Sequence, residues 1–399
     1  MAQALTMSLN TAALSSLRWQ STAHSVAEAD TLLSRLWSSE SRHLLTGSAG
    51  APLSPAETES QAVRTGVMNL VVIAPGEERA ISAAAALATL PRNPSRTLFI
   101  VPRDPEGPAT FKARMEVFCA VTPRGDGTAA CTELLWIDAS GEAGRHLSSI
   151  VPQLSLHDLP TLLWWDSQID PSSRDLRELF RGVDRVMVDG SHQRGIGVDV
   201  MRELVKATSG SGVALSDFSL IRQARWREAI ASMFDEPEVA PFLQCITEVH
   251  ASYAAGSGDK GPVNIVKPTY HLAWLASRLG WSISLPLQQG EAGWSGTAMD
   301  GARAIQLHLL PIANGERPGT TVGLTLRGER RGESLELVVR ADGTTTQSRV
   351  SINGTLVKER VFHAARATDA ELLSNSLELG EADPIAPAIL RTFIALVAS

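Results

Sequence analysis

Near the middle of the chain the sequence reads Leu159-Pro160-Thr161-Leu162-Leu163-Trp164-Trp165-Asp166. Its apolar residues follow one another directly, without the alternation that would leave one face of a strand in water. A strand of this kind is typical of a parallel sheet covered by helices on both faces. Trp164 and Trp165 are expected to fill the space beneath those helices, although indole rings also stack on ligands and partners. The segment therefore predicts an α/β fold.

The residues on both sides of this strand continue the pattern. We expect a helix at 26–37, and the strand, turn, helix and strand at 67–101 form a βαβ unit with parallel pairing. Segment 111–119 alternates apolar and charged residues, which predicts an edge or antiparallel strand beside 131–137. Further helices are expected at 141–150, 172–181 and 198–208, and a further strand at 185–188.

The second half of the chain has a different pattern, in which alternating segments are separated by glycine-rich turns. These segments are 304–310, 321–327, 334–340 and 347–352. They predict an antiparallel sheet, and Asp342-Gly343 and Asn353-Gly354 are typical of type I′ hairpin turns. Helices are expected at 223–234, 268–279 and 387–397, with the last packing across the sheet.

These patterns predict an N-terminal, mostly parallel α/β sheet domain followed by an α+β domain with antiparallel β hairpins. We expect a helix and flexible lead-in at 1–60, the α/β domain at 61–212 and the α+β domain at 213–399. Ser209-Gly210-Ser211-Gly212 has the composition of a flexible joint. A chain of 399 residues also exceeds the length at which single cores stop growing.

Charge and cysteine content exclude several classes of partner. The chain has 36 Lys and Arg against 43 Asp and Glu, so it lacks the basic field that nucleic-acid binding requires. Residues 1–19 do not resemble a secretory signal, and the longest apolar stretch, 80–90, is too short to cross a membrane. The 3 cysteines lack any Cys/His spacing suited to zinc and favour a reducing, cytoplasmic location.

The cysteines allow two interpretations. Cys119 and Cys131 fall on strands that could be neighbours, so a disulfide could form if they faced each other. The favoured interpretation is that they are buried free thiols acting as small apolar residues. The third cysteine is Cys245.

Catalytic motifs are absent from the sequence: it has no phosphate-binding loop, dinucleotide fingerprint, HExxH or GxSxG. We therefore expect no catalytic residues, no cofactor and no metal. Polar residues do follow predicted sheet strands, where α/β proteins keep ligands. These residues, Asp166, Asp189, Ser191 and His192, could equally serve as helix caps and turn residues.

One cluster suits recognition of a protein. Its members are Asp217, Arg222, Arg225, Trp226 and Arg227, where the first predicted domain passes into the second. Arginines that flank a tryptophan can stack on indole and pair with carboxylates, as at interface anchors. The alternative is a clamp that packs the two domains together.

At these residues the chain resembles the OpcA family, the glucose-6-phosphate dehydrogenase assembly proteins. The matching segments, in chain order, are 67–75, Asn93-Pro94-Ser95-Arg96 with the strand after it, Leu159-Pro160 leading to Trp164-Trp165, 217–227, and Ala273-Trp274-Leu275-Ala276-Ser277-Arg278-Leu279. Departures are Asn93 in place of histidine, Phe218 in place of leucine, and Leu220 in place of the family's first tryptophan. Pro94, Ser95, Arg96, Pro160, Trp164 and Trp165 are structural residues of these motifs.

The resemblance implies a non-enzymatic partner that binds glucose-6-phosphate dehydrogenase. Such a partner would favour the active oligomer, act as an allosteric activator and increase NADPH production in the oxidative pentose phosphate pathway. In photosynthetic relatives the family is linked to redox control through later cysteines, but this chain has none after Cys245. An alternative function is an α/β enzyme or binding protein for a sugar phosphate near Asp166, Asp189 and His192.

Overall fold

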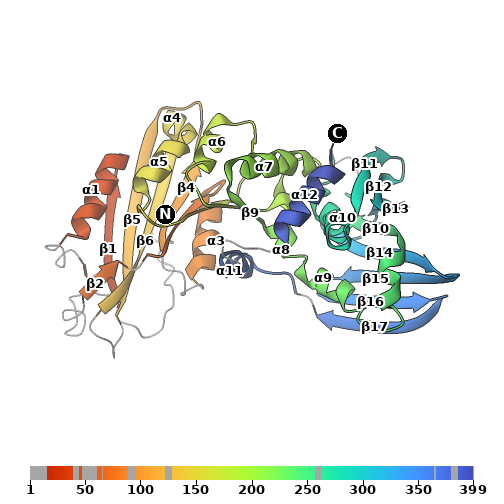
Figure 1. The fold of residues 1–399 in the computed structure, drawn as a ribbon. Helices are drawn as coiled ribbons and strands as arrows, with labels where there is room; N and C mark the ends of the chain where they lie inside the picture. Colours follow the sequence, from red (N-terminus) through yellow and green to blue (C-terminus); the bar gives the residue numbers. More distant parts are fainter. Residues whose placement is uncertain are drawn as a thin grey trace. The chain divides into compact units, whose positions relative to one another are not determined.

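The strand predicted around Trp164 is present as β7, Thr161–Trp165, inside a parallel part of the first of two sheets. In the computed structural model the chain forms unit 1, residues 1–187 with 211–214, and unit 2, residues 188–210 with 215–399 (Figure 1). The structure describes residues 16–38, 45–46, 61–64, 66–88, 95–121, 128–256, 262–363, 365–378 and 385–398.

The first sheet has the order β1-β5-β6-β4-β3-β7-β8-β9, and β2 pairs with β6. Besides β7, its strands are β1 Ser16–Ala23, β2 Gln61–Arg64, β3 Met68–Ile73, β4 Ser95–Pro102, β5 Thr110–Val121, β6 Thr128–Ser140, β8 Arg185–Val188 and β9 Ala214–Asp217. Strand β3 pairs in parallel with β4 and β7, and β4 pairs in parallel with β6. The predicted α/β sheet is therefore confirmed.

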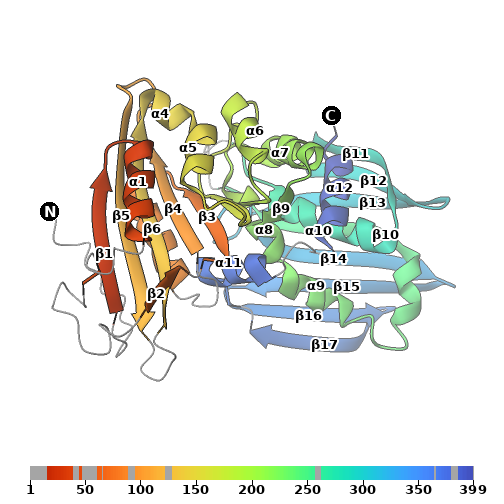
Figure 2. The ribbon, with the colours of Figure 1, turned by 60° about the vertical axis from the view of Figure 1, so that its left-hand side comes forward.

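Helices lie on both faces of this sheet. Unit 1 contains α1 Val26–Leu36, α3 Glu77–Ala88, α4 Gly141–Arg145, α5 Leu147–Leu154 and α6 Arg174–Phe180. In Figure 2, α1 and α5 lie in front of the sheet and α3 lies behind it. Right-handed crossovers that run in opposite directions along a sheet place their helices on opposite faces. This double cover explains why Trp164 is only 1% exposed.

Strand β5 is antiparallel to both of its neighbours, β1 and β6, as its alternating sequence predicts. Its buried residues include Ala113, Met115 and Val117, whereas the charged residues between them are partly exposed. Strand β1 was not predicted from the sequence. It forms the edge of the sheet and shields β5 from solvent, which is why β5 is an inner strand.

The favoured interpretation of two cysteines was wrong. Cys119 and Cys131 form a disulfide between β5 and β6. They are register partners in this antiparallel pair, so their side chains lie directly opposite one another on the same face. The bond is enclosed by a small core that includes Leu36, Leu45 and Val117.

The second sheet lies in unit 2 and has the order β11-β12-β13-β10-β14-β15-β16-β17. Its strands are β10 Ile246–Ala254, β11 Ser282–Gly290, β12 Gly293–Asp300, β13 Arg303–Ile312, β14 Thr321–Arg330, β15 Glu333–Asp342, β16 Thr345–Ile352 and β17 Thr355–His363. Consecutive strands from β11 to β13 and from β14 to β17 pair antiparallel, which confirms the antiparallel sheet predicted from the segments of β13 to β16. Strands β10, β11, β12 and β17 were not predicted. Among the strand pairings described in this second sheet, only that of β10 with β13 is parallel.

The helices of unit 2 include α10, which covers one face of this sheet. They are η3 Gly190–His192, α7 Val198–Ser211, α8 Phe218–Ile221, α9 Ala224–Ala231, η4 Ala240–Cys245, α10 Val266–Leu279, α11 Asp369–Glu378 and α12 Ala386–Leu396. Helix α10 contacts β10 and β13, and α12 packs on α10 and β11. The rings of Tyr270 and Phe393 meet at 4.9 Å between these two helices.

The predicted flexible joint is helical instead. Helix α7 extends through Ser209 and Gly210 to Ser211, and Gly212 follows with φ +75°. A glycine adopts this left-handed conformation without strain, so it ends the helix sharply. The serine- and glycine-rich segment 209–212 therefore marks the end of a helix. Within the described part of the chain no helix is long and apolar enough to cross a membrane.

Candidate functional site

A buried carboxylate, Asp189, lies at the end of β8 in unit 2. It caps η3 by accepting from the backbone N–H of Ser191 at 3.1 Å and from its hydroxyl at 2.6 Å. The guanidinium of Arg222 donates to it from the turn between α8 and α9. Burial favours the neutral acid, but the positive charges of Arg222 and His192 outweigh burial and hold the pKa of Asp189 below its ordinary value. Asp189 is therefore an anchored anion.

A second carboxylate, Asp217, is 2% exposed and lies beside the first. It caps α8 and accepts from Gly190 N at 3.0 Å, Ser219 N at 2.8 Å and the Tyr270 hydroxyl at 2.8 Å. Burial and the neighbouring charge of Asp189 raise the pKa of Asp217. Its contacts join η3, α8 and α10, so its role is to hold these elements of unit 2 together.

Helix α10 brings Lys267 toward these carboxylates. Burial, together with the nearby charges of Arg222, Arg366 and Arg317, lowers the pKa of the Lys267 amine to about 8, against the pull of Asp189. At neutral pH the amine is mostly protonated and lies among cations. The anion that offsets this repulsion is Asp189.

A pocket of about 240 Å³ opens beside η3. Its lining includes His192, Asn264 and Arg317, and His192 Nε2 lies 3.3 Å from Arg317 Nη1. The same ring nitrogen lies 3.5 Å from a carboxylate oxygen of Asp189. Burial and the surrounding cations Arg317, Arg222 and Lys267 lower the pKa of His192 despite Asp189. The pocket is thus polar and bordered by more positive than negative side chains.

The predicted recognition cluster separates into buried and exposed members, all in unit 2. Asp217 and Arg222 belong to the buried network just described. Arg227 donates to the backbone oxygen of Leu220 at 3.0 Å. Trp226 is partly buried, with its ring 5.2 Å from that of His271 on α10. Arg225 is exposed and pairs with Glu228 on the surface of α9.

The remaining predicted ligand residue, Asp166, lies in unit 1, whereas Asp189 belongs to unit 2. It forms an ion pair with Arg79 of α3, which ties the end of β7 to that helix. Ser191 and His192 are the predicted residues that the structure brings together with Asp189. No sequence motif pointed to Lys267 or Arg317. Lys267 and Tyr270 are three residues apart on one helix, and only the folded chain directs them toward Asp189 and Asp217.

The family-motif residues lie in and beside the first sheet. Arg96 is 3% exposed, pairs with Glu133 across β4 and β6, and donates to Leu154 O at 2.8 Å. The hydroxyls of Ser95 and Thr97 lie 2.9 Å apart. The Pro160 carbonyl accepts from Asn69 N at 2.8 Å, and the Trp165 indole donates to Gln168 O at 3.2 Å. Pro94 lies outside the described residues.

Solved structures with a similar backbone arrangement include oxidoreductases. One is an NAD binding oxidoreductase from Klebsiella pneumoniae, 12% identical, with a TM-score of 0.45, covering 84% of this chain and 94% of that one. Another is an oxidoreductase from Bacillus cereus, 11% identical, with a TM-score of 0.45, covering 82% of this chain and 93% of that one. At such low sequence identities and TM-scores, the similarity says nothing about the activity of this chain.

Two curated relatives share sequence with this chain. Both are named OxPP cycle protein OpcA. The protein of Synechocystis sp. is 25% identical over 299 residues, which are 72% of this chain and 60% of the relative. That of Synechococcus elongatus is 24% identical over 203 residues, which are 50% of this chain and 43% of the relative. The chain thus spans about half the length of these relatives.

Two family models together match most of the chain. Residues 86–203 match the glucose-6-phosphate dehydrogenase subunit N-terminal domain, and residues 213–386 match the C-terminal domain of the same subunit. The gap between the matches, 204–212, contains the end of α7 and Gly212. The matched segments include the strand of Trp164 and the cluster at Asp217 to Arg227, from which the resemblance was first drawn. The chain therefore belongs to the OpcA family of glucose-6-phosphate dehydrogenase assembly proteins.

Proposed function

We propose that this chain is a non-catalytic partner of glucose-6-phosphate dehydrogenase. It binds the enzyme, favours its active oligomer and so increases NADPH production in the oxidative pentose phosphate pathway. The observation that carries the proposal is the pair of family matches over residues 86–203 and 213–386. The buried polar groups at Asp217 and Arg222 support the non-catalytic role, because their hydrogen bonds and ion pair hold the fold together.

An activator must distinguish between two states of its target. A protein that bound the active and inactive forms equally could not shift their populations, however tight the complex. The proposal therefore requires that the chain bind the active oligomer more strongly than any other form. A coupling free energy of about 1–3 kcal/mol is typical and corresponds to roughly a 5- to 150-fold preference.

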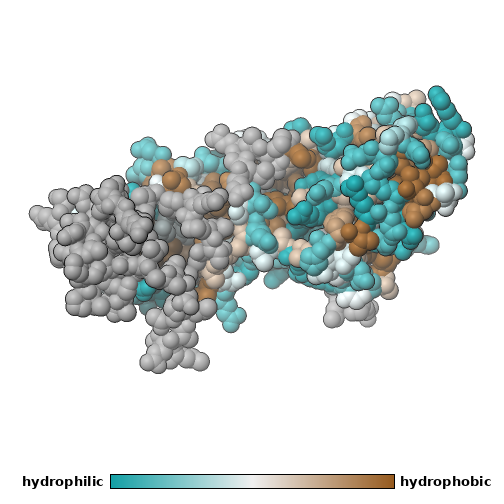
Figure 3. Space-filling view, turned by 90° about the horizontal axis from the view of Figure 1, so that it is seen from below, coloured by the Kyte–Doolittle hydropathy of each residue, from teal (hydrophilic) through white to brown (hydrophobic). Residues whose placement is uncertain are grey.

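The surface that best supports protein binding combines α9 with the edge strand β17. On α9 Arg225 is exposed and Trp226 half-buried. Lys358 of β17 donates to Ser232 O at 3.2 Å at the end of α9, so the two elements adjoin. On the same strand Leu356 is 48% and Val361 is 61% exposed. Figure 3 shows patches of hydrophobic residues among hydrophilic ones on the face in view. Exposed apolar, tryptophan and arginine side chains are typical of interface centres.

The experiment is a titration of the cognate dehydrogenase with this chain. The initial rate is measured across glucose 6-phosphate concentrations, while light scattering follows the mass of the complex. The proposal expects a saturable change in substrate affinity or turnover together with a larger assembly. If both proteins are folded and neither changes, the proposed partnership is rejected.

Variants test whether the surface of α9 and β17 is used. Arg225→Glu and Leu356→Glu should each weaken activation, because both replace an exposed contact by a carboxylate. The concentration of the chain required for half-maximal activation should rise at least ten-fold in each case. The matched control is Arg174→Glu on α6, where an exposed arginine also pairs with a glutamate one turn away. Equal activation by all three variants would place the interface elsewhere.

A second candidate function is binding of a sugar phosphate in the pocket at His192 and Arg317. The observation that favours it is the group of cations there, since Arg317 lines the pocket and the charges of Arg317, Arg222 and Lys267 act on His192. Saturation of such a site at ~100 times its dissociation constant stabilises the fold by about 2.7 kcal/mol. Thermal melts with glucose 6-phosphate should then show a shift that Arg317→Ala abolishes. An unchanged melting temperature removes this candidate.

A further inference from the structure

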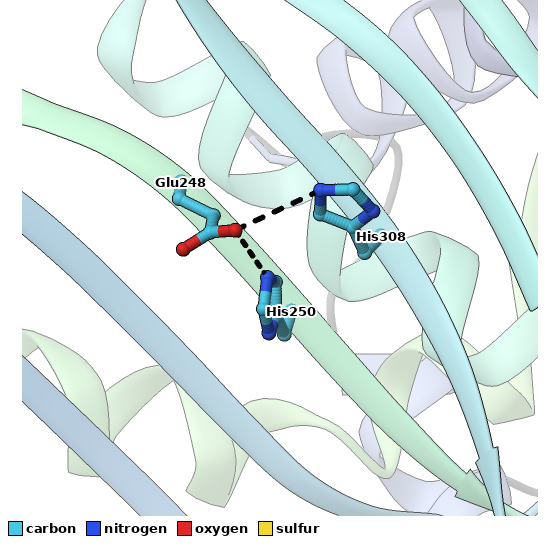
Figure 4. A group of neighbouring side chains, drawn as sticks. All are labelled: Glu248, His250 and His308. Atoms are coloured by element: carbon cyan, nitrogen blue, oxygen red, sulfur yellow. Dashed lines mark ion pairs between the residues drawn. The ribbon is translucent and has the colours of Figure 1, made fainter. Parts of the chain in front are cut away.

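The open face of the second sheet holds a cluster of metal-ligating side chains away from the pocket at Asp189. Glu248 and His250 are two residues apart on β10, so they lie on the same face of the strand. His308 on β13 is the register partner of His250 in the parallel pair. Figure 4 shows the three side chains converging from two adjacent strands.

The potential ligand atoms are close enough to share one ion. One carboxylate oxygen of Glu248 lies 2.7 Å from His250 Nε2 and 3.8 Å from His308 Nε2. All three ligand atoms lie within 4.8 Å of one another. Ligand atoms around a tetrahedral zinc ion are about 3.3 Å apart, given metal–ligand distances of about 2.0 Å. The observed spacings bracket that value.

The surroundings orient these side chains. Arg327 on the neighbouring strand β14 donates to the second oxygen of Glu248 at 3.2 Å and is itself held by Glu336 at 3.0 Å. This contact directs the first oxygen toward the histidines, which is what outer contacts do at metal sites. The side chains of the three residues are between 20% and 30% exposed, so an ion could enter and keep a water ligand.

We propose that Glu248, His250 and His308 bind one divalent transition-metal ion, with a further coordination position open to solvent. Two imidazoles and one carboxylate form the ligand set of open zinc sites and also of iron(II) sites. Magnesium and calcium prefer oxygen ligands and are not expected here. The site is independent of the proposed partnership with the dehydrogenase, because it lies on strands that the interface hypothesis does not use.

The test is a titration of the full-length, chelator-treated chain with Zn²⁺, followed by calorimetry, in the presence of excess Mg²⁺. The proposal expects one Zn²⁺ per chain, and His308→Gln or His250→Gln should each weaken binding at least ten-fold. The matched control is His146→Gln, because His146 faces Glu142 at 3.9 Å without a third ligand in the described structure. Thermal melts without metal confirm that the variants are folded.

Spectroscopy distinguishes a specific metal site from nonspecific electrostatic binding of cations. Co²⁺ in place of Zn²⁺ should give the intense visible absorption of a four- or five-coordinate ion with nitrogen ligands, and Zn²⁺ should displace it. Fe²⁺ is compared in the same assay under argon to decide which ion is preferred. Binding that is equal in the wild type and in His308→Gln, displaced by Mg²⁺, or absent would overturn the proposal.

Discussion

At the scale of single residues, unit 2 holds a buried ion pair between Asp189 and Arg222. The side chain of Asp189 is 6% exposed and that of Arg222 is 13% exposed. Taking two charges out of water is costly, and the pair is favourable only while both partners are present. The same residue type on the surface of α9, Arg225, is 69% exposed and contributes little. Burial, and not residue type, separates the two arginines.

We predict that Arg222→Ala lowers the free energy of unfolding by about 3 kcal/mol, because the buried Asp189 carboxylate loses its guanidinium partner. Urea denaturation followed by circular dichroism measures the change. Arg225→Ala serves as the control and should stay within about 0.5 kcal/mol of the wild type. Similar losses for both variants would show that Arg222 does not act through its buried partner.

His271 makes stability depend on pH. It is 1% exposed on α10, and burial followed by the charge of Arg227 lowers its pKa to about 3. The folded chain therefore keeps the imidazole neutral, whereas the unfolded chain protonates it below about pH 6.5. Since the unfolded state binds more protons, stability must fall as the pH falls.

We predict that this one group removes about 2 kcal/mol of stability between pH 7 and pH 5. The measurement is urea denaturation of the wild type and of His271→Leu at both pH values. The variant should lose that share of the pH dependence, whatever its absolute stability. The same slope in both proteins would show that His271 is protonated in the folded state.

At the scale of elements, strand pairing decides the chemistry of the cysteines. The sequence left a disulfide and two free thiols as alternatives. Only the register of β5 against β6 places Cys119 opposite Cys131. A shift by one residue would turn one of the two side chains to the other face of the sheet. Register is a property of the pair of strands, so neither segment alone could have decided between the alternatives.

We predict that the denatured, unreduced chain has one reactive thiol, Cys245, and that reduction yields all 3. Titration with a chromogenic disulfide counts the thiols. Because the bond joins residues 12 apart, reduction should lower the free energy of unfolding by up to about 3 kcal/mol. Three thiols before reduction, in protein purified without reductant, would contradict the pairing.

The hairpin turns show which backbone conformations the local sequence predicts and which it does not. At Asn353-Gly354 both residues have positive φ, 51° and 77°, as the predicted type I′ turn requires. Gly343 also has positive φ, but Asp342 is the last residue of β15, so the turn residues are Gly343 and Thr344. Arg331 has φ 51° before Gly332 and carries no turn signal in the sequence. There the pairing of β14 with β15 imposes the conformation.

At the scale of the whole molecule, the proposed partnership has a thermodynamic consequence. If the chain raises the affinity of the dehydrogenase for glucose 6-phosphate by some factor, then glucose 6-phosphate must raise the affinity of the dehydrogenase for the chain by the same factor. This reciprocity follows from the closed cycle of binding steps. It holds for any interface that links the two proteins.

We predict that saturating glucose 6-phosphate strengthens the complex by between about 5- and 150-fold, the range typical of allosteric coupling. Surface plasmon resonance with immobilised chain gives the dissociation constant with and without the sugar phosphate. Arg317→Ala in the chain is the control, because its pocket could bind the sugar phosphate directly. Unequal coupling factors in the two directions would mean that activation does not act through substrate affinity.

The sequence by itself determined the class of fold and the family. Hydrophobic periodicity reports the burial of each strand face, so β7, β5 and the strands β13 to β16 of the second sheet could be predicted. The ordered motifs were enough to indicate the OpcA family, which the two family matches then established. Strand β1 was missed because its pairing with β5, nearly 100 residues later, has no local signal.

Only the tertiary structure decided which side chains meet. Asp189, Asp217, Arg222 and Lys267 come from separate elements of unit 2 and form one network because the folded chain brings these elements together. His308 lies beside Glu248 and His250 through the one parallel pairing described in the second sheet. The physical reason is that local sequence sets each segment's periodicity, whereas the contacts of charged side chains depend on register and burial between distant segments.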